Sequence, residues 1–575
     1  MNGAGTTALQ AGDWSRRHSL GLAFLLVLAL ALLAPFLDYL TDDTFIYLHF
    51  AKHLTQGHGF SFNAGEPTYG ATSPLWVLLL AAAGAGLPGG VNAPREASTM
   101  PSLAWAAKFY GALFHVLAIW LLVRIARRLG WDAWTALALG ALLAAHAWVV
   151  RWSLSGLESP LAIACVAGAL LALAGVFLDG KRAILAGILL GLSALARPEC
   201  YLLVALAAFA VAYGAERFRR RRAAELLIGA GLVLVPWLLT AWSWFHRLLP
   251  NTAAAKAGAW LHPGLIVNAI QAALQIELST DAVPLALFAI VLAIGSASTA
   301  LPAARGRRAF WMLIAMWPPL LALSLALGGV QVVSRYLLPA APCVLLLGVA
   351  SLRWLVASTF PRRHAIALPL LLGVFAAQNL TITAIVSVPL TRAHTRGLRE
   401  SLVALGIWAR DHTPSKSYFA AADIGAFGYY SERRVLDLYG LVTPAMAPIV
   451  VREGYDGVVE RLLFDRAGRP EYLIDRYSLP ARLTRRSETP SPYRFLFARE
   501  IANLGITRPG RYYYSVYSID WAVVDSTSEH IADGGAVAGN RASGYNRGKD
   551  PSPRLFGGHN HLTFNRLPSK APVSS

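Results

Sequence analysis

Charged residues are scarce in this chain. Asp, Glu, Lys and Arg together make up 14% of the 575 residues, whereas 56% of the residues are hydrophobic. Roughly a quarter of the residues of a soluble domain are charged. The composition therefore excludes an ordinary soluble protein and indicates that a lipid bilayer surrounds most of the chain.

Acidic residues are fewer than basic ones, with 32 Asp and Glu against 51 Lys and Arg and a formal net charge of +19. Such an excess can indicate a nucleic-acid partner. Many of the basic residues, however, stand in short clusters between apolar runs, as they do in the cytoplasmic loops of membrane proteins. The clearest clusters are Arg124/Arg127/Arg128, Arg217/Arg219/Arg220/Arg221/Arg222 and Arg305/Arg307/Arg308. The charge therefore reflects membrane topology, and we expect no nucleic-acid partner.

Cysteine is rare as well. Cys165, Cys200 and Cys343 are the three in the chain, all in or beside apolar runs, so no disulfide is expected. The histidines of the first loop have no cysteine beside them and match no structural zinc spacing.

Eleven apolar runs are predicted to cross the membrane, since a spanning helix needs about 20 mostly apolar residues. The runs are 19–37, 104–123, 133–150, 159–178, 183–197, 200–215, 224–244, 283–301, 309–328, 334–352 and 364–389. The two short runs on either side of Pro198 could be tilted or broken helices.

The basic clusters orient these spans. If residues 1–18 are cytoplasmic, every cluster falls on the cytoplasmic side, and the first loop (38–103) is periplasmic. This topology requires that Leu75–Leu87 does not cross. That run has about 13 residues, which suits a re-entrant or interfacial helix at 74–88.

The composition changes after Val388. Apolar runs shorten to strand length, with Gly, Pro and Asp turns between them. These runs are Tyr418–Ala422, Val435–Leu438, Tyr472–Ile474, Tyr512–Tyr517 and Trp521–Val524. The sequence thus predicts a polytopic α-helical membrane domain (19–389) followed by a soluble α/β domain on the periplasmic side (390–532). The tail 533–575, rich in Gly, Asn, Ser and Pro, is expected to be poorly ordered.

Polar residues of different chemical types gather at the predicted outer ends of the spans. Ionisable groups near a bilayer are costly and tend to mark functional paths. The set includes Tyr47, His58 and Glu66 in the first loop, and then Glu158, Arg197, Asn251, Lys256 and Arg335. Acids and cations that converge on one face suggest an active site at the outer membrane surface.

The pair Asp42-Asp43 lies a few residues beyond the first span. Two adjacent carboxylates repel each other, so one of them can have a raised pKa and accept a proton, or the pair can bind a divalent cation. A carboxylate of the first kind can take the proton of an attacking hydroxyl. Alternatively, the pair and Thr41 only cap the helix that follows.

The neighbouring residues favour the catalytic interpretation. Short motifs appear in a fixed order along the chain: Asp42–Tyr47, Phe50–Leu54, Gly57–Glu66, Tyr69–Trp76, Ser155–Glu158, Ala196–Glu199, Leu249–Thr252 with Lys256, Ser334–Pro339, Ala422–Gly425 and Val435–Leu441. This ordered set, which covers most of residues 20–475, resembles the GT-C glycosyltransferases. It is most similar to the branch that includes the actinobacterial terminal arabinofuranosyltransferases.

The resemblance implies a multi-pass enzyme of the bacterial inner membrane. Such an enzyme moves a sugar, here arabinofuranose, from a polyprenyl-phosphate carrier to an acceptor hydroxyl at the periplasmic face, with inversion. A first-loop Asp is the general base, and Asp42 is preferred over Asp43. A hexose or amino-sugar donor stays open, and the acceptor can be a polysaccharide, a glycolipid or a surface protein.

Further roles follow from the same resemblance. Lys256, Arg335 and Arg197 are expected to hold the donor phosphate, because cations favour a leaving group whose negative charge grows. Snorkelling of these side chains toward lipid head groups is the alternative. The remaining candidates for substrate binding or support are Tyr47, His58, Glu66, Glu158 and Asn251. Glu158 and Glu199 could instead pair with Arg151 and Arg197.

No cofactor is predicted, apart from a divalent cation that Asp42 and Asp43 could bind. Two other classes of function compete with the transferase. A lipid-linked-sugar transporter or flippase needs polar residues along a path through the bilayer, and few are present there. An envelope-assembly scaffold explains the outer domain but not the Asp pair. Transfer of a whole oligosaccharide is not separated from transfer of a single sugar.

Overall fold

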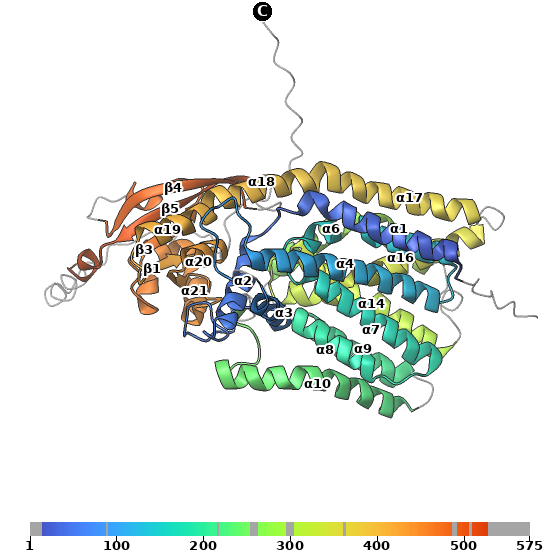
Figure 1. Cartoon of the computed structure of the whole chain (residues 1–575). Coiled ribbons are helices and arrows are strands. Elements are labelled where there is room, and N and C mark those ends of the chain that lie inside the picture. The colour runs from blue at the N-terminus through green and yellow to red at the C-terminus, as the bar shows by residue number, and fades with distance from the viewer. Residues whose placement is uncertain are drawn as a thin grey trace, which may run out of the picture.

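The computed structural model describes residues 14–87, 90–214, 218–252, 263–294, 304–359, 364–485, 491–504 and 509–526. A bundle of long helices forms one part of the molecule, and a five-stranded sheet with short helices forms the other (Figure 1). The sheet lies beyond one end of the bundle, and the helix α2 of the first loop lies between the two parts.

Seven helical segments of the described ranges are long and apolar enough to cross a membrane. They are Arg16–Phe36 (α1, Arg16–Leu33, with η1, Ala34–Phe36), α4 (Ser102–Arg128), α7 (Ser159–Asp179), α10 (Arg219–Phe245), α14 (Arg305–Leu327), Ser334–Thr359 (α15, Ser334–Leu337; η3, Leu338–Ala340; α16, Ala341–Thr359) and Leu368–His412. A further span results if α5 (Ala133–Ala145) and α6 (Ala147–Ser153), which meet at a bend of 62°, form one crossing. Lipid offers no hydrogen-bond partners to the backbone, and a helix pairs its own N–H and C=O groups internally. The protein is embedded in a membrane, as its composition predicts, while the number of eleven crossings stays a prediction.

Three apolar helices are shorter. The helix α3 (Pro74–Ala85) falls within the predicted segment 74–88, and its 12 residues are too few for a crossing. The Ser73 hydroxyl caps it by accepting from the Trp76 N–H at 3.3 Å. The helices α8 (Ile184–Ala196) and α9 (Cys200–Gly214) are separate and meet at Pro198, as the sequence suggests.

The helix α12 (Pro263–Ile294) differs from the prediction. It begins ahead of the predicted run 283–301 and bends at Asp281, whose backbone is not helical. The Ser and Thr residues before Asp281 interrupt the apolar pattern, which is why the sequence did not indicate the first half. Residues 295–303 lie outside the described ranges.

Arginine-rich helix ends meet at the end of the bundle far from the sheet. Arg128 of α4 forms an ion pair with Asp179 at the end of α7, and Arg222 of α10 donates to the Gly180 carbonyl. The start of α7, next to Glu158, lies at the opposite end, where the first loop packs. The predicted topology requires this arrangement, with the basic loops at one end of the bundle and the first loop at the other.

One helical run connects the bundle to the sheet (Figure 1). It consists of α17 (His364–Ile382), the π-helical segment η4 (Thr383–Ser387), α18 (Val388–Leu398), a second π-helical segment η5 (Arg399–Val403) and α19 (Ala404–His412). The domain boundary predicted near residue 390 lies inside this run. The helical run therefore continues across the predicted boundary, and the short turn 413–417 then leads to the first strand of the sheet.

The sheet has the strand order β2-β1-β3-β5-β4. Its strands are β1 (Tyr418–Ala421), β2 (Arg434–Asp437), β3 (Tyr472–Tyr477), β4 (Tyr493–Asn503) and β5 (Pro509–Ile519). The strand β1 is parallel to β2 and β3, whereas β5 is antiparallel to β3 and β4. The parallel strands are joined through the helices α20 (Gly425–Ser431) and α21 (Ala447–Glu460), as parallel strands require.

One strand prediction was wrong, and one strand was not predicted. Trp521–Val524 is helical and not extended, because the Asp520 carboxylate accepts from the Ala522 N–H at 3.0 Å and starts a helical turn. The strand β4 was not predicted, since charged residues such as Arg499 and Glu500 interrupt its apolar alternation. Pairing with β5 stabilises it nonetheless.

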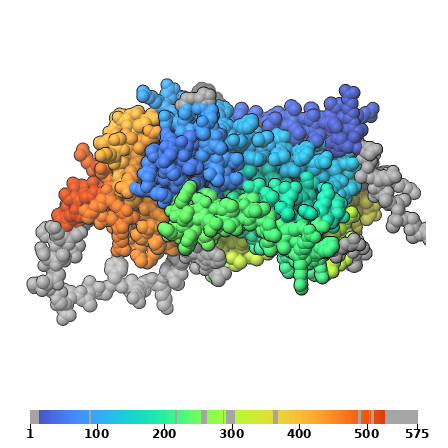
Figure 2. All heavy atoms as spheres, turned by 60° about the horizontal axis from the view of Figure 1, so that its bottom comes forward, coloured from blue at the N-terminus to red at the C-terminus, as the bar shows by residue number. Residues whose placement is uncertain are grey.

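The first loop forms the interface between bundle and sheet. The helix α2 (Asp42–Thr55) begins at the Asp pair, and its residues from Thr44 to His53 are all buried. The Thr44 hydroxyl donates to the Ser155 carbonyl of the bundle at 2.6 Å. On the other side, Asn63 donates to and accepts from the backbone of Val435 at 3.0 and 2.9 Å. The space-filling view shows the first-loop segment in blue against the sheet region in orange (Figure 2).

Candidate functional site

Asp42 and Asp43 occupy the first turn of α2, and the Thr41 hydroxyl accepts from the Thr44 N–H at 3.3 Å. The pair thus does start a helix, as the capping alternative predicts. Consecutive side chains of a helix point about 100° apart. The two carboxylates therefore have different partners: Asp43 binds Arg335 of the bundle, and Asp42 binds the sheet region.

Arg335 is the central cation on the bundle side. Its guanidinium group forms an ion pair with Asp43 and lies 5.5 Å from the ring of Trp152 and 5.2 Å from that of Tyr336. The guanidinium of Arg197 lies 4.8 Å from the same Tyr336 ring. The structure therefore places two of the predicted phosphate-binding cations on one aromatic side chain.

Arg197 is already paired. It donates to Glu158 at 2.6 Å and to Glu199 at 3.0 Å, and its side chain is only 4% exposed. Glu158 pairs with Arg197 and not with Arg151, which donates instead to the Tyr39 hydroxyl at 2.8 Å. Two carboxylates balance the charge of Arg197, so Arg335 is better suited than Arg197 to attract a phosphate.

Asp42 faces the sheet region. Its carboxylate accepts from the Gly425 N–H at 3.0 Å and from the Ala426 N–H at 2.7 Å. Burial, the nearby negative charge of Asp423 and that of Asp43 raise the pKa of Asp42 to about 7, although the two amide hydrogen bonds act in the opposite direction. Asp42 is thus a carboxylate that can take up a proton near neutral pH.

Asp423 belongs to a charged network at the ends of the central strands. Both of its oxygens accept from Arg476 at 2.7 Å, and one accepts from the Tyr514 hydroxyl at 2.7 Å. Arg476 also donates to the Tyr439 hydroxyl at 3.1 Å. One signal for this network is visible in the sequence, namely the turn at Asp423 after a strand. Its contact with the first loop could not be foreseen, because Gly425 is 383 residues from Asp42.

Two other predicted residues lie near Arg335 and Arg197. Tyr47 is buried and shares a hydrogen bond with the Thr72 hydroxyl. Burial, and the charge of Glu158, raise the pKa of Tyr47 well above its usual range, while Arg197 and Arg335 lower it. Tyr47 and Glu158 therefore lie in the same electrostatic environment as the two cations.

The remaining predicted residues lie elsewhere. Glu66 forms a half-exposed ion pair with Arg434 of β2 at 2.7 Å. Asn251 is buried and donates to the Leu441 carbonyl at 3.0 Å. Both residues join the first loop or the bundle to the sheet region, away from the Asp pair. His58 is exposed, and Lys256 lies outside the described residues.

In the part of the chain that the structure describes, no group of three or more His, Cys, Asp or Glu side chains could hold a metal ion. The two Asp carboxylates have different partners, and Arg335 already binds Asp43. This arrangement is a poor cation site, and the divalent cation stays an untested prediction.

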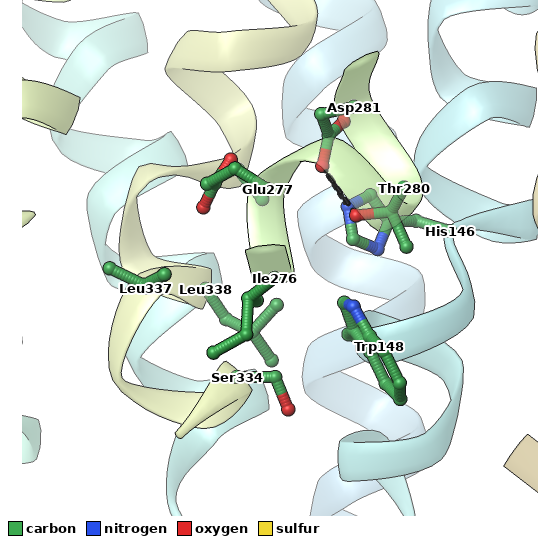
Figure 3. A pocket seen from close by; sticks show the side chains of 10 residues that line it. His146, Trp148, Ile276, Glu277, Thr280, Asp281, Ser334, Leu337 and Leu338 are labelled. Carbon is green, nitrogen blue, oxygen red and sulfur yellow. Dashed lines mark hydrogen bonds and ion pairs between the residues drawn. The ribbon is translucent and has the colours of Figure 1, made fainter. Parts of the chain in front are cut away.

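A separate polar cluster lies inside the bundle (Figure 3). His146, at the bend between α5 and α6, has its Nε2 2.9 Å from Asp281, and the Thr280 hydroxyl donates to the same carboxylate at 2.8 Å. With Glu277 and Ser334 these residues line a cavity of about 10 Å³, which is the space that one water needs. The cluster joins the bend of α5 and α6 to the kink of α12. The sequence did not indicate it, because His146 and Asp281 are 135 residues apart and come together only in the folded bundle.

The sequence of the sheet region matches a known family model. Residues 390–524 match a family model described as a domain of unknown function, DUF8728. No curated protein matches the chain.

Solved structures are similar over most of the chain. The apo structure of ArnT from Cupriavidus metallidurans is 13% identical, with a TM-score of 0.50 over 79% of this chain and 93% of that one. The oligosaccharyltransferase AglB from Archaeoglobus fulgidus is 14% identical, with a TM-score of 0.49 over 80% of this chain and 69% of that one. The arabinofuranosyltransferase AftD from Mycobacteria is 14% identical, with a TM-score of 0.45 over 88% of this chain and 42% of that one. The chain has the overall fold of ArnT, which confirms the GT-C fold predicted from the sequence.

Proposed function

We propose that this protein is a membrane glycosyltransferase that moves a sugar from a polyprenyl-phosphate carrier to an acceptor hydroxyl at the outer face of the membrane. The observation that carries the proposal is the ion pair between Asp43 of the first loop and Arg335 of the bundle. It brings a pair of carboxylates to a cation beside the membrane spans. A transferase with a phosphate leaving group needs a base and a cation at one site.

In the proposed reaction, the acceptor hydroxyl attacks the anomeric carbon of the donor sugar from the side opposite the phosphate. Asp42 takes the hydroxyl proton as the new carbon–oxygen bond forms. The bond between the anomeric carbon and the phosphate oxygen breaks, and the polyprenyl phosphate leaves with the electron pair. Attack from the opposite side inverts the configuration of the sugar.

The roles of the charged residues follow from their surroundings. Asp42, with a pKa raised to about 7, is a better base than an ordinary carboxylate. Arg335 stabilises the negative charge that grows on the phosphate, and Lys256 is proposed to assist it. Arg197 is assigned to holding Glu158 and Glu199 in place.

The finer points of the proposal come from the resemblance of the sequence. They are arabinofuranose as the sugar, the bacterial inner membrane as the location, and a periplasmic position for the sheet region. A polysaccharide, a glycolipid or a surface protein is the acceptor.

The test is sugar transfer by the purified protein in detergent, with synthetic polyprenyl-phosphate pentoses and hexoses. We expect wild-type protein to transfer a sugar and Asp42→Asn to lose about a hundredfold or more of its turnover, since a positioned base contributes 10²–10⁴-fold. Donor binding should survive in that variant because Asn keeps the shape of Asp.

A matched control is Asp525→Asn, which removes a half-exposed carboxylate that pairs with Arg469 on the sheet region. It should leave turnover unchanged. The proposal fails if the wild-type protein neither binds nor turns over any of these donors.

A further inference from the structure

The C-terminal region contacts the proposed base directly. The Gly425 and Ala426 N–H groups, which lie within the matched domain of unknown function, donate to the two oxygens of Asp42 at 3.0 and 2.7 Å. Through these two bonds the carboxylate is fixed in both position and rotation. A region that only anchors the protein or captures a partner has no need of this contact.

The approach of the two segments is very close. A Cβ atom on Gly425 would lie 1.9 Å from the Asp42 carbonyl oxygen and 3.1 Å from the carboxyl carbon. Only glycine allows the backbone to come this near. The absence of a side chain at residue 425 is therefore a condition for the contact with Asp42.

Asp423 lies beside this contact and is itself held firmly. Arg476, at the end of β3, binds both of its oxygens, and Tyr514 of β5 donates to one of them. Three strands of the sheet thus fix one carboxylate next to the proposed base. Its negative charge disfavours the ionised form of Asp42 and makes Asp42 a stronger proton acceptor.

The whole interface keeps this arrangement rigid. The buried Lys52 of α2 forms an ion pair with Glu432 at the end of α20. Asn63 exchanges two backbone hydrogen bonds with Val435, and Phe62 packs against Gly428. The first loop is therefore held against the sheet region at several points besides Asp42.

We infer that residues 390–524 complete the active site: Gly425 and Ala426 hold the base Asp42, and Asp423, fixed by Arg476, is a positioning residue that keeps that base reactive. The inference rests on the proposed function, because it assigns a role in the same reaction. It gives the domain of unknown function a task in catalysis that does not depend on binding substrate.

The full-length protein in detergent tests the inference, with a polyprenyl-phosphate sugar that the wild-type protein turns over. Kinetics are compared for wild type and Asp423→Asn from pH 5.5 to 9. The charged groups around Asp42 are Asp43 with its partner Arg335, and Asp423 with Arg476 and Tyr514. The substitution removes the negative charge of Asp423 and leaves the positive charge of Arg476 without its partner. Both effects favour the ionised form of Asp42.

We expect the acid limb of the kcat profile of Asp423→Asn to shift to lower pH, because Asp42 then ionises more readily. The plateau should fall about tenfold, since a weaker base accepts the proton less well. The KM for the donor should stay unchanged. Gly425→Ala is a second variant, and we expect a fall in kcat of about a hundredfold, as a displacement of about 1 Å can cause.

Arg434→Gln serves as the control, because it removes an exposed ion pair of the same interface away from Asp42. It should match the wild-type protein in kcat and in pH profile. If Asp423→Asn keeps the wild-type plateau and acid limb, or if it loses donor affinity together with kcat, the inference is wrong while the proposed function stands. If the wild-type protein transfers no sugar at all, the proposed function fails and the inference fails with it.

Discussion

Asp42 and Asp43 are neighbours in sequence, but their surroundings differ. Asp43 is about half exposed and binds the cation Arg335. Asp42 lies in a more enclosed position, with two amide N–H donors on its carboxylate and a second negative charge nearby. Asp43 therefore binds a cation, whereas Asp42 is placed to accept a proton.

A pH profile tests this difference. Only ionised Asp42 can accept the hydroxyl proton, so its raised pKa of about 7 predicts that kcat falls as the pH decreases through 7. At pH 6 the turnover should be about tenfold below the plateau, because about one carboxylate in ten is then ionised. Any residual activity of Asp42→Asn should lack this limb. A wild-type profile that stays level down to pH 5 would show that the base has an ordinary carboxyl pKa.

At this scale the sequence predicted the acids better than their partners. Thr41, Asp42 and Asp43 stand out after an apolar span, and the ordered motifs point to the same place. The sequence did not reveal that Asp423 lies next to Asp42, because no periodicity connects residues so far apart. It also included Arg197 among the candidates for binding the donor phosphate, whereas Arg197 is already paired with two carboxylates. Spacing along a chain does not report which charges are already paired.

At the scale of the elements, Arg197 connects four helices. It lies in the break between α8 and α9, binds Glu158 at the start of α7, and stacks on Tyr336 of α15. Pro198 ends α8 and leaves Arg197 extended, so that the guanidinium reaches across. The short helices that the sequence marked as broken are thus fixed at their outer ends by an ion pair.

Removal of this cation should destabilise the bundle. Arg197→Gln leaves Glu158, which is 2% exposed, without its charged partner, and an uncompensated buried charge costs about 3–5 kcal/mol. The melting temperature in detergent should therefore fall clearly. Arg434→Gln, which breaks the half-exposed pair with Glu66, should change stability by less than about 1 kcal/mol. Equal melting temperatures for the two variants would show that the Arg197–Glu158 ion pair does not stabilise the bundle, and would favour a role of Arg197 in binding the donor phosphate.

The strands show a similar limit of the sequence. Short apolar runs with turn residues between them identified β1, β2, β3 and part of β5. The hairpin of β4 and β5 depends on pairing between strands, which a charged sequence does not reveal. The kink of α12 was missed for a related reason, because its polar cluster with His146 forms only in the folded bundle.

At the scale of the whole molecule, the basic helix ends and the sheet lie at opposite ends of the bundle (Figure 1). Under the positive-inside rule this arrangement supports the proposed position of the sheet region outside the cell. The three native cysteines are buried, so a single introduced cysteine can report the side on which it lies.

We expect a membrane-impermeant maleimide to label Ser478→Cys, on the exposed surface of the sheet region, in intact spheroplasts. Ser358→Cys, which is exposed near the end of α16, should be labelled only after the membrane is opened. The unsubstituted protein provides the background. The reverse pattern would invert the proposed topology and place the Asp pair in the cytoplasm.

The separation of Asp42 from its amide partners also has a consequence for biosynthesis. On the proposed orientation, Asp42 is exported with the first loop, whereas Gly425 is synthesised 383 residues later and must cross after the last span. A partly translated chain therefore carries a base that nothing holds. Catalytic competence then begins only after the segment that carries Gly425 has been exported, so a translation product that stops before this segment cannot consume the lipid-linked donor.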